Sequence, residues 1–149
     1  MSIPSSPFRS QTASSNCVGV SDPNPAILHL ALRCDRYAPG AVRRALEGVS
    51  EIAPVLDDVK LVATELVNNA VLHSGCSADD VLRVNAQLVP GSLTISVHDP
   101  GLADLGPRLH AFEDSPEPGG MGLRIVEELA RRWGAERPDG RRVWAELAL

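Results

Sequence analysis

The segment from Val55 to His73 is the longest stretch of the chain with a regular apolar period. Its apolar side chains recur every three or four positions, which is the spacing of one face of an α-helix. Pro54 lies near the expected start of this helix and Gly75 at its expected end, because glycine commonly follows the last helical turn. The segment therefore predicts a long amphipathic helix. The residues of its apolar stripe are Val55, Val59, Val62, Ala63, Leu66 and Ala70.

The segments on either side of this helix carry strand and helix patterns in turn. Residues 26–33 alternate apolar and polar positions and predict a strand, and helical spacing over 39–49 predicts a short helix. Two β-type runs follow the long helix, at 81–89 and 93–97. They are joined by a Pro-Gly pair at 90–91, which predicts an antiparallel hairpin.

The last third of the chain begins with residues 102–119, which are rich in proline, glycine and acidic side chains. This segment is longer than a usual connection, so it predicts a functional loop or lid. A helix is expected over 121–133, and residues 142–149 alternate as a closing strand after a turn at 138–140. The apolar face of that helix consists of Leu123, Val126, Leu129 and Ala130.

Length and composition place these elements in one domain. A chain of 149 residues that is 44% hydrophobic and 22% charged can bury a core without metal or disulfide cross-links. Residues 1–25 are rich in Ser and Pro and are expected to be a disordered or loosely attached tail, with the domain at 26–149. The tail lacks the apolar core of a signal peptide or membrane span, so the protein is expected in the cytoplasm.

The charged residues limit the partners and the nucleotide chemistry. The net charge is −5 and the arginines are scattered among acids, which argues against a nucleic-acid or membrane surface. Lys60 is the only lysine and stands in DDVKLVATEL, so neither a Walker A loop nor a eukaryotic-type kinase strand is present. Cys17, Cys34 and Cys76 are far apart in sequence and are expected to be reduced cytosolic thiols.

The first motif is a row of polar residues along the long helix. Glu65, Asn69 and His73 recur every four positions and share one side of the helix. An asparagine carbonyl is a suitable neutral ligand for Mg²⁺, and a glutamate one turn earlier could orient a water or accept a hydroxyl proton. The alternative is a solvated polar face with no ligand.

The second and third motifs are a strand end and a glycine-rich helix start. Asp99 ends the strand ISVHD, where a carboxylate would accept a hydrogen bond from the adenine amine, and Gly101 would let the backbone approach the ring. The alternative is a plain Asp-Pro-Gly turn. Gly119, Gly120 and Gly122 open the next helix, where free N–H groups suit phosphate oxygens, although glycines also serve as flexible helix starts.

The three motifs, in this order, resemble the N, G1 and G2 boxes of the Bergerat-fold (GHKL) ATPases. Over residues 26–149 the chain resembles bacterial anti-sigma factor serine/threonine kinases of the RsbW type. The matching strings are residues 63–73, 99–101, 119–134 and 143–147. The resemblance implies an α/β two-layer sandwich, with helices packed on one face of a mixed, mostly antiparallel sheet.

The resemblance also implies a role for each motif residue and names the ligands, ATP and Mg²⁺. Asn69 would bind the Mg²⁺, Glu65 would be the catalytic carboxylate and Asp99 would bind the adenine amine. The nucleotide and its phosphates would be held by Gly101, Gly120, Met121, Gly122 and Leu123. Arg108 in the lid would be a candidate for the γ-phosphate or the substrate.

Three functions follow from the resemblance. The first is a kinase that phosphorylates an anti-anti-sigma (STAS-type) partner and otherwise holds a sigma factor inactive. The second is a nucleotide-gated module that binds its partner without phosphorylating it. The third, a detached catalytic domain of a sensor histidine kinase, is disfavoured because no helical dimerisation segment precedes the domain. A homodimer is compatible with each of them.

Overall fold

The structure of the protein is a computed structural model that describes residues 25–101, 119–137 and 140–149. Its five strands form one sheet in the order β1-β2-β3-β5-β4, and all four pairings are antiparallel. The strands are β1 (Ala26–Arg33), β2 (Val81–Val89), β3 (Ser92–Asp99), β4 (Arg132–Glu136) and β5 (Arg141–Ala148). The helices are α1 (Ala38–Glu47), the 3₁₀ helix η2 (Ser50–Val55), α2 (Leu56–His73) and α3 (Gly119–Leu129).

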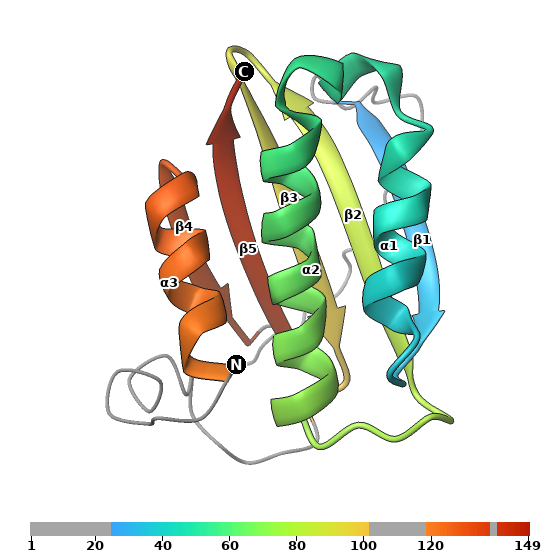
Figure 1. Ribbon diagram of the computed structural model, residues 1–149. Coiled ribbons are helices and arrows are strands. Elements are labelled where there is room, and N and C mark those ends of the chain that lie inside the picture. The colour runs from blue at the N-terminus through green and yellow to red at the C-terminus, as the bar shows by residue number, and fades with distance from the viewer. Residues whose placement is uncertain (1–24, 102–118, 138–139) are drawn as a thin grey trace, which may run out of the picture.

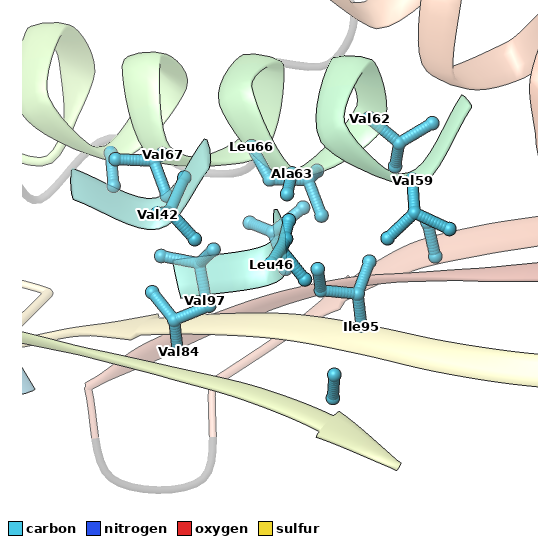
Figure 2. Close-up of a cluster of buried hydrophobic side chains, with 14 of the residues drawn as sticks. Val42, Leu46, Val59, Val62, Ala63, Leu66, Val67, Val84, Ile95 and Val97 are labelled. Carbon is cyan, nitrogen blue, oxygen red and sulfur yellow. The ribbon is translucent and has the colours of Figure 1, made fainter. Parts of the chain in front are cut away.

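The three α-helices lie side by side on one face of this sheet, which confirms the expected two-layer α/β sandwich (Figure 1). The central strands alternate, with Leu93, Ile95 and Val97 of β3 buried on the helix-facing side. Figure 2 shows Ile95 and Val97 beneath Leu46 of α1 and Leu66 of α2. Burial of these side chains on both layers is the main force that holds α2 against the sheet.

No helix of the described residues covers the opposite face of the sheet (Figure 1), and charged side chains of β4 and β5 lie on that face. Arg142 of β5 donates to Glu136 of β4 at 3.1 Å, and Arg132 of β4 pairs with Glu146 of β5. The two ion pairs join the last two strands across this face. The side chains of the strands therefore divide by their period of two, with mainly apolar residues under the helices and mainly polar residues outside, where Trp144 is an aromatic exception.

The predicted elements over 26–33, 39–49 and 55–73 are confirmed as β1, α1 and α2, and the hairpin over 81–97 as β2 and β3. The 3₁₀ helix η2, which holds Pro54, was not expected. The closing strand is confirmed as β5. The predicted tail and the lid with Arg108 lie outside the described residues, apart from Pro25 and Gly119 at their ends.

The helix predicted over 121–133 is wrong at its C-terminal end, because α3 ends at Leu129 and Trp133 lies in β4. The backbone N–H of Arg131 donates to the Glu146 carbonyl at 2.7 Å and turns the chain into the sheet. Gly134 then lies under the Trp144 ring, since a β-carbon there would stand 3.2 Å from the ring. Pairing with a strand that follows later in sequence outweighs the local helical period.

The prediction of reduced thiols is wrong for two of the three cysteines, because a disulfide joins Cys34 and Cys76. Cys34 follows β1 and Cys76 follows α2, 42 positions apart in sequence, and their Cα atoms are 6.1 Å apart. The Cys34 N–H also donates to the Asp80 carbonyl at 3.0 Å, which fixes the two segments side by side. Cys17 lies outside the described residues.

Candidate functional site

The three predicted motifs converge on one end of the sandwich. The C-terminal end of α2, the end of β3, the start of α3 and the start of β5 all lie at the lower end of Figure 1. Helix α2 packs against both β3 and α3, so it forms the centre of this end. Segments that are 20 or more positions apart in sequence are thereby brought to a single region.

Asn69 is the most constrained residue of the polar row on α2. Its side chain is buried, with 7% of the residue exposed, and its Oδ1 atom has no hydrogen-bond partner in the part of the chain that the structure describes. A buried carbonyl oxygen without a partner costs free energy, which a bound cation or donor would recover. The position and chemistry of Asn69 therefore fit the predicted Mg²⁺ ligand.

No group of three or more His, Cys, Asp or Glu side chains that could hold a metal occurs within residues 25–101, 119–137 and 140–149. Asn69 would be one protein ligand of a Mg²⁺ ion that also binds waters and nucleotide phosphates. Mg²⁺ commonly binds in this way, with one or two protein ligands.

Glu65 lies one helical turn before Asn69 and is half-buried. Burial raises the pKa of its carboxyl above the usual value, because a low-dielectric environment disfavours the charged form. A carboxylate with a raised pKa is a stronger proton acceptor. His73, one turn after Asn69, is also half-buried at the end of α2.

Asp99 is the last residue of β3 and is 3% exposed. Its Oδ1 atom accepts a hydrogen bond from the Gly101 N–H at 2.7 Å, and its Oδ2 atom accepts one from Nε of Arg141 at 3.0 Å. Both side chains of the ion pair are almost completely buried. The carboxylate is thereby held in one orientation as a buried acceptor, which is the form that a group binding an exocyclic amine requires.

Arg141 was missed by the sequence analysis. The register of the sheet places it directly opposite Asp99, on the first residue of β5. The two arginines at the start of β5 carry a basic signal, but nothing local distinguishes Arg141 from Arg142. Arg142 points to the other face of the sheet and pairs with Glu136. Only the pairing of β3 with β5 separates the two arginines.

Gly101 has a structural requirement of its own. Its φ is +66°, and a β-carbon there would stand 2.9 Å from the backbone of Gly140. The glycine at this position is therefore required by the packing of two turns, whether or not a nucleotide ring lies near it.

The third motif forms the first turn of α3, where Gly120, Met121 and Gly122 follow Gly119. Leu123, the next residue, is buried at 5% exposure. Helix α3 begins at the end of the sandwich where α2 and β3 end, which is the end that carries Asn69 and Asp99. The first turn of any helix has N–H groups without partners in the helix. Such groups suit an anion.

Comparison with known families agrees with this arrangement. The family described as the histidine kinase-like ATPase domain matches residues 36–147, well over half of the chain. The chain therefore belongs to the histidine kinase-like ATPase family. All three motifs lie within the matched residues, and an ATPase domain of this family is an ATP-binding domain. A search among curated proteins found no match.

The histidine kinase-like ATPase domain described here has no helix long and apolar enough to cross a membrane in the residues whose structure is described. The candidate site residues come from α2, β3, α3 and β5, and Gly101 follows β3. In chemical terms they offer a neutral oxygen for a cation, a buried carboxylate paired with an arginine, and a helix start suited to an anion.

Proposed function

We propose that this ATPase domain is a cytoplasmic anti-sigma factor serine/threonine kinase that uses ATP and Mg²⁺. It would phosphorylate an anti-anti-sigma (STAS-type) partner and otherwise hold a sigma factor inactive. The observation that carries the proposal is the pair on α2, in which half-buried Glu65 precedes Asn69 by one turn. The RsbW-type strings at 63–73 and 119–134 support the same assignment.

The chemistry of transfer divides between these two residues. Asn69 would contribute its unpaired carbonyl oxygen to the Mg²⁺ that binds the phosphates. Glu65, whose pKa is raised by burial, would accept the proton of a serine or threonine hydroxyl of the partner as that oxygen attacks the γ-phosphate. The hydroxyl oxygen gains the phosphoryl group and ADP leaves.

One observation favours a second function, a nucleotide-gated binding module without transfer. A general base is usually oriented by a further hydrogen-bonding group, and the Glu65 carboxylate has no such partner in the ranges that the structure describes. The features proposed to bind nucleotide, Asn69 and the Asp99–Arg141 pair, do not depend on Glu65.

Partner capture followed by transfer assays would test the two functions. The protein would be co-purified from the cells that produce it, and whatever binds would be incubated with labelled ATP. Under the kinase proposal, Glu65→Ala keeps nucleotide and partner binding and lowers transfer by roughly 10²- to 10⁴-fold. Asn69→Ala weakens binding of the Mg²⁺-nucleotide itself.

Asp58→Ala supplies the matched control, because Asp58 is an exposed carboxylate two turns earlier on the same helix. Its transfer rate should equal that of the wild type. A wild-type protein that binds its partner with ATP but transfers no phosphate, and that behaves identically after Glu65→Ala, would overturn the kinase proposal in favour of the binding module.

A further inference from the structure

Two nitrogen atoms of the Arg141 guanidinium differ in their hydrogen bonding. Nε donates to Asp99 at 3.0 Å, whereas Nη2 is buried and has no hydrogen-bond partner in the described part of the chain. The whole residue is 5% exposed, so water does not readily reach this donor. A buried donor of a charged group that lacks an acceptor is costly, and a ligand atom that accepted its hydrogen would remove the cost.

Covalent geometry fixes where that free donor lies. The guanidinium is planar, and the Nε–H and one Nη2–H point in the same direction as the two prongs of a fork. Because the Nε–H donates to the Asp99 carboxylate, the Nη2–H lies beside that carboxylate and is directed past it. A carboxylate oxygen and an unused N–H therefore stand next to one another at the end of β3.

We propose that Arg141 is a specificity-determining residue of the nucleotide site, whose Nη2 donates to N1 of adenine while Asp99 accepts from the amino group at N6. This inference rests on the ATP site of the proposed function. Adenine presents a donor at N6 next to an acceptor at N1, which complements an acceptor next to a donor on the protein. Guanine presents an acceptor at O6 next to a donor at N1, so both contacts would be mismatched.

The pair explains why an arginine is used at this position. A lone carboxylate would have to be buried as an isolated charge, which is strongly unfavourable, and it would select only the amino group. Arg141 compensates the charge through Nε and, through the second prong, adds a contact to a second ring atom. A lysine would supply the positive charge but not the two parallel N–H donors of a guanidinium.

The decisive experiment uses the full chain with Mg²⁺ and three nucleotides: ADP, 1-deaza-ADP, which lacks the N1 acceptor, and 7-deaza-ADP, which keeps it. Calorimetric titration of the wild type should show 1-deaza-ADP binding about tenfold or more weakly than ADP, as expected for a lost hydrogen bond to a charged donor. The affinity for 7-deaza-ADP should stay close to that for ADP. Equal affinity for all three, or a loss confined to 7-deaza-ADP, would overturn the assignment to N1.

Two variants then connect the effect to Arg141. In Arg141→Lys, ADP affinity should fall to about that of 1-deaza-ADP, and the two should no longer be distinguished. Arg142→Lys is the matched control, since Arg142 pairs with Glu136 on the other face of the sheet, and it should discriminate like the wild type. A wild-type preference for ADP that persists unchanged in Arg141→Lys would show that Arg141 only supports the fold.

The outcomes separate this inference from the proposed function. Failure of the wild type to bind ADP or ATP would overturn the nucleotide function as a whole. Binding of ADP without discrimination against 1-deaza-ADP would overturn only the role of Arg141. Loss of phosphate transfer with discrimination intact would overturn only the kinase.

Discussion

Gly101 and Gly140 approach so closely that a β-carbon on Gly101 would stand 2.9 Å from the Cα atom of Gly140. Both residues have positive φ, at +66° and +89°. The first lies in the turn that follows β3 and the second in the turn that precedes β5. Their contact joins the two turns immediately beside Asp99 and Arg141, so the packing of two glycines holds the buried ion pair in place.

Substitution of Gly140 should destabilise the protein by more than its backbone conformation alone explains. Gly91→Ala is the matched reference, because Gly91 also has positive φ but has nothing within 4 Å of a β-carbon. The left-handed backbone conformation should lower the free energy of unfolding of Gly91→Ala by about 1–2 kcal/mol. In Gly140→Ala, overpacking against Asp99 and Pro100 should lower it by about 1–3 kcal/mol more. Urea unfolding measures both, and equal losses would contradict the close approach.

Removal of one partner of the Asp99–Arg141 pair should be severe. Asp99→Asn leaves the arginine buried without a counter-charge, and the loss of unfolding free energy should be about 3–5 kcal/mol. The double variant Asp99→Asn with Arg141→Met should recover much of that loss, because no buried charge remains. Denaturant midpoints test this, and a single variant as stable as the wild type would mean that the pair contributes nothing to the fold.

The Cys34–Cys76 disulfide should contribute measurably to stability. It closes a long loop of sequence separation 42, and cross-links of this kind contribute about 2–4 kcal/mol. A reductant should lower the melting temperature of the wild type but leave that of the double variant Cys34→Ser with Cys76→Ser unchanged. Thiol titration of denatured protein should find two more free thiols after reduction than before. The same thiol count before and after would exclude the bond.

The raised pKa of Glu65 predicts how its removal depends on pH. A carboxyl whose pKa is higher in the folded than in the unfolded protein favours folding below its ordinary pKa, and this contribution is lost as the pH rises through the folded value. Glu65→Gln should therefore raise the melting temperature at about pH 8 and change it little at about pH 4.

Glu47 provides a comparison of opposite sign in the same experiment. A hydrogen bond from Lys60, at 2.6 Å, lowers the pKa of Glu47, so its stabilising contribution is present above the ordinary pKa and is lost as the pH falls through the folded value. Glu47→Gln should slightly lower the melting temperature at about pH 8. Parallel shifts of the two variants would contradict the assigned environments.

Local sequence was sufficient for the elements whose residues interact mainly with one another. The period of 3.6 over 55–73 defines α2, and the alternation over 81–97, interrupted at Pro90 and Gly91, defines the hairpin. Asn69 and Asp99 could be singled out for the same reason, because each stands at a recognisable place on such an element. The Asn69 carbonyl oxygen is buried and has no hydrogen-bond partner among the described residues, and its role as a Mg²⁺ ligand stays a prediction.

The strand β4, the disulfide and the placing of the two arginines depend on pairing between different segments of the chain. The strand β4 is too short to be recognised from its own sequence and forms by pairing with β5. Cys34 and Cys76 form a disulfide because the ends of β1 and α2 lie side by side. Arg141 and Arg142 are adjacent in sequence, and only the register against β3 sends the first into the core beside Asp99 and the second to the open face. A strand turns successive side chains to opposite faces, so the function of each arginine depends on a pairing that its own segment does not contain.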